Sequence, residues 1–136
     1  MYSVLLVDDE PSVLTGLRYV IDWDEYGVEI AGTASNGTQA LELLRELPVD
    51  ILITDIQMPQ MGGLELLQQV RAQNMDLRCI ILTGYDDFKY VKKAAQLGIE
   101  NYLLKPVSPE ELSETLLNTI TKIEYLRSRK LDLSLI

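Results

Sequence analysis

The stretch Ile51-Leu52-Ile53-Thr54-Asp55 decides the fold, because it sets a carboxylate directly behind a short, unbroken apolar run. Similar runs occur at Val4–Val7, Ile80–Leu82 and Tyr102–Leu104. Each run is too short for a helix and nearly continuous rather than alternating, which is typical of strands buried on both faces of a parallel sheet. Residues 29–34 form a fifth, weaker candidate with an alternating pattern. We therefore expect five strands.

Amphipathic stretches separate these runs and predict five helices. In the first four, the apolar positions at helical spacing are Val13, Leu14, Leu17, Val20 and Ile21; Ala40, Leu41, Leu44 and Leu47; Leu64, Leu67 and Val70; and Phe88, Val91, Ala94 and Ala95. A fifth, longer stripe runs from Leu112 to Leu126, and Ser108 as N-cap before Pro109 marks its start. Strands that alternate with helices predict right-handed βα units and a three-layer α/β domain.

Composition bounds the classes of function. The 136 residues fit one domain, and 47% hydrophobic with 24% charged residues is the balance of a globular protein. A net charge of −9 argues against direct nucleic-acid binding, since an acidic surface repels the phosphate backbone. Because the chain has no histidine, Ser-His-Asp catalysis, Cys-His catalysis and histidine-ligated metal sites are excluded.

Neither the cysteine content nor the hydropathy pattern indicates an extracellular or membrane protein. The single cysteine, Cys79, lies in an apolar run and is interpreted as a buried structural thiol. The N-terminus shows no basic region followed by a long apolar stretch, and no uninterrupted apolar segment is long enough to span a bilayer. We expect a location in a reducing cytoplasm and no membrane partner.

Polar residues follow four of the predicted strands. They are Asp8, Asp9 and Glu10 after the first run, Asp55 after the third, Thr83 and Gly84 after the fourth, and Lys105 and Pro106 after the fifth. In open α/β sheets, ligands bind beyond the carboxyl ends of the strands. We therefore expect these residues to lie together at one edge of the sheet.

The chemistry of this set points to a metal and a phosphoryl group. Carboxylates gathered at one edge raise each other's pKa unless a cation joins them, and hard oxygen donors favour Mg²⁺ or Mn²⁺ over zinc. Lys105 would supply a positive charge and Thr83 a hydrogen-bond donor for the phosphoryl oxygens. Asp55, at the end of the presumed central strand, is best placed to be the nucleophile that forms an acyl phosphate.

Each of these residues alone also has a structural interpretation. An Asp-Asp-Glu-Pro run often starts a helix, a Lys-Pro pair often forms a turn, and Asp55 could be a turn residue before Met58-Pro59. The conjunction of acid, acid, hydroxyl and base at four strand ends is what favours a functional site.

Five motifs occur together, in order: Asp8-Asp9, Asp55-x-x-Met58-Pro59, Gly62-Gly63, Leu82-Thr83-Gly84 and Leu104-Lys105-Pro106. As a set they resemble the receiver domain of two-component response regulators, over about residues 2–126. The resemblance implies the flavodoxin-like receiver fold, a parallel sheet of five strands in the order 2-1-3-4-5 flanked by five helices. It also implies a signalling domain, not an enzyme, that a sensor histidine kinase phosphorylates on Asp55.

For the metal, the resemblance implies that Asp9 and Asp55 bind Mg²⁺ through their side chains. Gln57 would bind the ion through its backbone carbonyl, and Asp8 through a water molecule. Mn²⁺ could substitute for Mg²⁺.

For the phosphoryl group, the resemblance implies that Thr83 and Lys105 bind its oxygens, and that the Lys105–Pro106 peptide bond is cis. On phosphorylation Thr83 would move toward the phosphoryl group and Tyr102 would turn inward. That change would alter the face formed by residues 86–126, which would contact an output domain or a second receiver.

Two positions vary among receivers and affect how long the phosphoryl group lasts. Here they are Gln57 and Tyr85, and we expect Tyr85 to shield the acyl phosphate from water.

The expected domain organisation is a receiver domain at residues 1–126 and the start of a linker or a C-terminal tail at residues 127–136. The segments Trp23–Gly27 and Gly84–Phe88 look like those of receivers joined to AraC-type helix-turn-helix domains. The expected output is therefore transcriptional, with DNA binding in the full-length protein. The alternative is a stand-alone receiver that acts as a binding module without DNA output.

Two other functions share parts of this pattern. A phosphatase of the haloacid dehalogenase type needs an acid two residues after its nucleophile, where this chain has Gln57. A flavodoxin-like FMN binder needs a hydroxyl- and glycine-rich loop after the first strand, where Asp8-Asp9-Glu10 would repel the FMN phosphate. Neither fits as well as a receiver.

Overall fold

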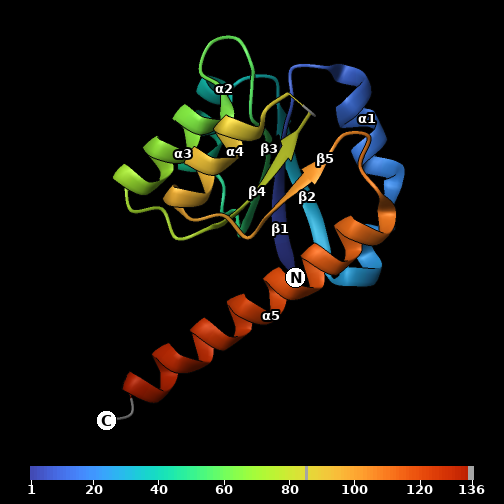
Figure 1. The fold of residues 1–136 in the computed structure, drawn as a ribbon. Helices are drawn as coiled ribbons and strands as arrows, with labels where there is room; N and C mark the ends of the chain where they lie inside the picture. The colour runs from blue at the N-terminus through green and yellow to red at the C-terminus, as the bar shows by residue number, and fades with distance from the viewer. Residues whose placement is uncertain (85, 135–136) are drawn as a thin grey trace.

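Five parallel strands form a central sheet in the order β2-β1-β3-β4-β5, which confirms the predicted fold (Figure 1). The computed structural model describes residues 1–84 and 86–134. The strands are β1 (Tyr2–Val7), β2 (Val28–Ala34), β3 (Ile51–Asp55), β4 (Arg78–Thr83) and β5 (Asn101–Leu104). The helices are α1 (Pro11–Val20), the 3₁₀ helix η1 (Trp23–Tyr26), α2 (Gly37–Glu46), α3 (Gly63–Ala72), α4 (Phe88–Leu97) and α5 (Pro109–Ser134).

Successive residues of β1 point into two apolar clusters, one on each side of the sheet. Leu5 and Val7 pack with α2, α3 and α4, whereas Val4 and Leu6 pack with α1 and α5. Helices α2, α3 and α4 therefore cover one face of the sheet, and α1, η1 and α5 cover the other (Figure 1). Because β1, β3 and β4 are covered on both faces, nearly all their residues are buried, as the continuous apolar runs predicted.

The strand β5 departs from that expectation. Only Leu103 is buried, while Tyr102 and Leu104 are 50% and 39% exposed. β5 is an edge strand that pairs with β4 alone, and a continuous apolar run does not distinguish an edge strand from an inner one. Phe88, which was assigned to the apolar stripe of α4, is 79% exposed.

Polar contacts fix two of the connections. As predicted, Ser108 caps α5, since its hydroxyl oxygen accepts a hydrogen bond from the backbone N–H of Glu111 at 3.3 Å. The segment after α1 forms η1, in which Trp23 is buried and donates its ring N–H to the carbonyl oxygen of Leu17 at 3.0 Å. The longer connection thus anchors α1 to the core.

Cys79 is fully buried in β4, and burial raises the pKa of its thiol to about 11. The thiol therefore stays protonated at neutral pH and is structural, as the sequence indicated. Among the helices that the structure describes, none combines the length and the apolar character that crossing a membrane requires.

Candidate functional site

The carboxyl ends of the strands meet at one edge of the sheet, because all five strands run in the same direction (Figure 1). Asp55 and Thr83 end β3 and β4, while Asp8 and Lys105 follow β1 and β5. Four residues that are far apart in the sequence therefore share this edge.

The ammonium group of Lys105 lies among three carboxylates. Its Nζ atom is 3.1 Å from Oδ2 of Asp55, 3.3 Å from Oδ2 of Asp8 and 3.8 Å from Oε1 of Glu10. Glu10 was expected at this edge but was given no role there; its side chain is 61% exposed, so its ion pair is the weakest of the three. The Lys105–Pro106 peptide bond, which precedes α5, is cis.

Backbone groups orient the two buried carboxylates. Oδ1 of Asp8 accepts a hydrogen bond from the N–H of Glu10, and Oδ1 of Asp55 accepts one from the N–H of Ile56, both at 2.9 Å. In each residue the second oxygen, Oδ2, faces Lys105. Both carboxylates are thus held in place before any ligand arrives.

Burial dominates the electrostatics of the site. Asp8 is fully buried and Asp55 is 4% exposed. Burial and then the charge of Asp8 raise the pKa of Asp55 to about 6, and burial also raises the pKa of Asp8. Burial alone would lower the pKa of Lys105, but the hydrogen bond and the charge of Asp55 help to raise it above its usual value. Two buried carboxylates beside one ammonium leave a surplus of negative charge that a cation would relieve.

The acids that follow β1 offer a place for that cation. Carboxylate oxygens of Asp8, Asp9 and Glu10 lie within 4.8 Å of one another, with Asp8 buried and the other two exposed. Carboxylates are the hard oxygen donors that Mg²⁺ and Mn²⁺ prefer. Asp55 adjoins this group through the ammonium that it shares with Asp8. The residues present therefore fit a divalent cation such as Mg²⁺.

Thr83 lies at this edge of the sheet, but its hydroxyl is directed at Gly84 and Asp87 and not at Asp55 or Lys105. The side chain is 1% exposed, and Oγ1 lies 3.1 Å from the carbonyl oxygen of Gly84 and 3.4 Å from Oδ2 of Asp87. In the described part of the chain the hydroxyl makes no hydrogen bond to Asp55 or Lys105. Asp87 was missed in the sequence, although an acid three residues after Gly84, at the start of a helix, was a visible signal.

Gly63, at the start of α3, packs against the backbone of Asp55. A Cβ atom at Gly63 would collide with the carbonyl oxygen of Asp55 and would lie 3.0 Å from Cα of Ile56. The N–H of Gly63 donates a hydrogen bond to the carbonyl oxygen of Ile56 at 3.0 Å. Only glycine allows the start of α3 to approach the end of β3 this closely, a reason that the Gly62-Gly63 motif alone did not reveal.

The other residues predicted for the site are largely exposed in the described part of the chain. Gln57 is exposed, as is Asp9 within the acidic group. Tyr102 is half exposed and lines a hollow with Asn101 and Leu104, between β5 and the start of α5. Tyr85 lies outside the described residues.

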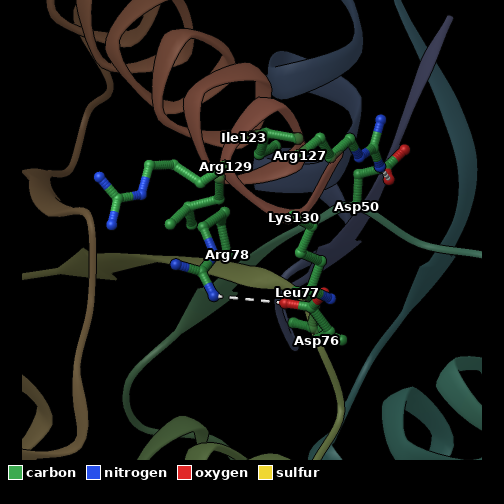
Figure 2. A pocket seen from close by; sticks show the side chains of 9 residues that line it. Asp50, Asp76, Leu77, Arg78, Ile123, Arg127, Arg129 and Lys130 are labelled. Atoms are coloured by element: carbon green, nitrogen blue, oxygen red, sulfur yellow. Dashed lines mark hydrogen bonds and ion pairs between the residues drawn. The ribbon is translucent and has the colours of Figure 1, made fainter. Parts of the chain in front are cut away.

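A second hollow, of about 400 Å³, lies at the opposite edge of the sheet (Figure 2). The last turns of α5 and the residues at or before the starts of β3 and β4 line it. Arg127 pairs there with Asp50 at 2.8 Å, and Lys130 pairs with Asp76 at 3.7 Å. These ion pairs connect α5 to the loops that precede β3 and β4, at the edge of the sheet opposite Asp55.

The family of response regulator receiver domains matches residues 4–117. The chain belongs to this family. Receiver domains are signalling domains that interact with sensor histidine kinases, and they generally bind Mg²⁺ at an acidic pocket.

Curated relatives of this receiver domain are named as transcriptional regulators. It is 37% identical over 124 residues to the uncharacterized transcriptional regulatory protein YesN of Bacillus subtilis, covering 91% of this chain and 34% of that protein. It is 38% identical over 112 residues to the transcriptional regulatory protein HptR of Staphylococcus aureus, covering 82% of this chain and 44% of that protein. The chain thus spans between a third and a half of the length of these relatives.

Solved structures agree on the fold. The receiver domain of AraT, a response regulator from Geobacillus stearothermophilus, matches with a TM-score of 0.85 and 38% identity, over 93% of this chain and 98% of that one. A two-component transcriptional regulator AraC from Clostridium phytofermentans matches with a TM-score of 0.83 and 30% identity, over 92% and 97% of the two chains.

Proposed function

We propose that this receiver domain accepts a phosphoryl group on Asp55 from the phosphohistidine of a sensor histidine kinase. The supporting observation is a buried carboxylate at the end of the central strand, fixed by a backbone N–H and facing an ammonium group that it shares with Asp8. An oxygen of ionised Asp55 would bond to phosphorus while the bond from phosphorus to the histidine nitrogen breaks, its electron pair leaving with the imidazole. Such a transfer depends on positioning and charge neutralisation more than on acid–base groups, which suits a site without histidine.

The residues around Asp55 support that role. Lys105 would balance the charge of the phosphoryl oxygens, and Thr83 would donate a hydrogen bond to one of them. Asp8, Asp9 and Asp55, with the backbone carbonyl of Gln57, would hold Mg²⁺, which supplies positive charge to the acidic edge when bound. With a pKa of about 6, Asp55 is largely ionised at neutral pH and available as a nucleophile.

The signal would leave the site through α4, β5 and α5, within residues 86–126. Thr83 would turn toward the phosphoryl group and Tyr102, now half exposed, would turn inward. Gln57 and Tyr85 would set the lifetime of the acyl phosphate.

The output we propose is transcriptional, in the cytoplasm, because these relatives are named as transcriptional regulators and are about two to three times as long as this chain. Residues 1–126 would form the receiver. Residues 127–136 would begin a linker, and α5 runs without a break past residue 126 to Ser134.

Intact mass after incubation with acetyl phosphate and Mg²⁺ tests the proposal. The wild type should gain the mass of one phosphoryl group, and Asp55→Asn should gain none. Asp24→Asn, which removes an exposed carboxylate from η1, is the matched control and should behave like the wild type. A wild type that gains no phosphoryl group, even from a cognate kinase, would refute the proposal, as would equal labelling of Asp55→Asn.

A further inference from the structure

The side chain of Asp87 does not have the usual role of an acid at a helix N-terminus. As the residue before α4, Asp87 makes no side-chain hydrogen bond to the backbone of the helix that it precedes. Its Oδ2 atom turns back instead and accepts a hydrogen bond from the N–H of Gly84 at 2.9 Å, with the hydroxyl oxygen of Thr83 at 3.4 Å. The carboxylate therefore ties the start of α4 to the end of β4.

The hydroxyl of Thr83 has a single proton to donate. In this structure the proton can go to Asp87 or to the carbonyl oxygen of Gly84. A phosphoryl group on Asp55 would bring new acceptor oxygens to the same edge, and Thr83 could donate to them only after leaving its present partners. Asp87 and the phosphoryl group thus compete for one hydroxyl.

We propose that Asp87 is a positioning residue that holds Thr83 in the unphosphorylated arrangement, so that phosphorylation of Asp55 and release of the start of α4 are coupled. This inference rests on the proposed function of Asp55. A hydrogen bond to a charged acceptor is stronger than one between neutral groups, so the carboxylate favours the present arrangement. By linkage, the factor by which the tie between Asp87 and Thr83 weakens the binding of a phosphoryl group equals the factor by which the phosphoryl group weakens the tie.

Binding of beryllofluoride, a mimic of the phosphoryl group, tests this in the presence of Mg²⁺. We expect Asp87→Ala to bind it at least about fivefold more tightly than the wild type, the lower end of common coupling between two sites. Asp87→Asn keeps an acceptor oxygen for Gly84 and Thr83, so its affinity should lie between those of the wild type and Asp87→Ala. Asp86→Ala removes the same charge from the neighbouring exposed position and should bind like the wild type.

A double-mutant cycle separates positioning through Thr83 from a role in helix capping. In a Thr83→Val background, which lacks the hydroxyl, Asp87→Ala should give no further gain. An equal gain with and without the hydroxyl, an equal gain in Asp86→Ala, or no gain in Asp87→Ala would overturn the inference. Asp55→Asn tests the proposed function separately. Loss of beryllofluoride binding in this variant would support Asp55 as the acceptor, whereas unchanged binding would show that the proposed function itself fails.

A folding defect in Asp87→Ala would not hide the answer. In the wild type, the amide resonance of Gly84 should shift when beryllofluoride binds, because its acceptor moves away. An amide resonance of Gly84 that stays fixed while other residues near Asp55 shift would contradict the coupling.

Discussion

The fold places the carboxyl group of Asp55 in a buried site that disfavours its ionised form. The carboxylate is 4% exposed, and burial together with the charge of Asp8 raises its pKa from 3.8 to about 6. The folded state therefore holds the proton more tightly than the unfolded state does. As pH rises from about 4 to about 6, the contribution of Asp55 to folding stability falls, and above that range Asp55 is ionised in both states and its loss is complete.

The residue-scale prediction is that Asp55→Asn stabilises the protein at neutral pH. A pKa difference of this size corresponds to roughly 2–3 kcal/mol, so the variant should gain up to about that much at pH 7.5. The gain should shrink as pH falls toward 4, where the wild-type carboxyl is protonated. Urea denaturation with a metal chelator at both pH values measures it, with Asp24→Asn as the control. A gain that is absent, or the same at both pH values, would contradict the burial argument.

At the scale of elements, the contact between α3 and β3 is set by one glycine. A Cβ atom at Gly63 would collide with the carbonyl oxygen of Asp55, so Gly63→Ala must push α3 and β3 apart. We expect a loss of about 1–3 kcal/mol in the free energy of unfolding, the usual cost of overpacking, and slower phosphorylation by acetyl phosphate. Gly16→Ala is the control: Gly16 lies within α1 and has no atom within 4 Å of an added Cβ, so this change should leave stability equal or higher. Equal stability of Gly63→Ala and the wild type would show that the close approach is not required.

The sequence predicted where the strands lie in the chain better than it predicted which residues are exposed and which way their side chains point. Unbroken apolar runs located β1, β3 and β4, because strands covered on both faces need apolar residues throughout. The exposure of β5 could not be predicted, since an edge strand with an apolar surface has the same local pattern as an inner strand. The same limit applies to the site. The strand-end rule brought Asp55 and Lys105 together. It did not reveal that the Thr83 hydroxyl lies against the carbonyl oxygen of Gly84 and the side chain of Asp87.

Across the whole molecule, α5 links the two edges of the sheet. It begins at Pro109, a few residues after Lys105, and its last turns reach the hollow at the opposite edge (Figure 2). There Asp50 holds the helix to the sheet. Its Oδ1 pairs with Arg127 at 2.8 Å, while its Oδ2 accepts a hydrogen bond from the N–H of Ser3 at 2.9 Å. A movement at the start of α5 therefore acts on a helix whose far end is fastened to β1.

This arrangement predicts that Asp50 controls the order of the end of α5. Asp50→Ala should speed hydrogen exchange in residues 123–130 by about fivefold, as expected for an ion pair worth about 1 kcal/mol. Asp76→Ala is the matched control, because the side chains of Asp76 and Lys130 are 79% and 80% exposed, so their pair is screened by water and its loss should change exchange little. The start of α5 near Ser108 should exchange at the wild-type rate in both variants, since its cap is untouched. If Asp76→Ala loosened the helix as much as Asp50→Ala, the fastening would come from general surface charge and not from the contact between Asp50 and Arg127.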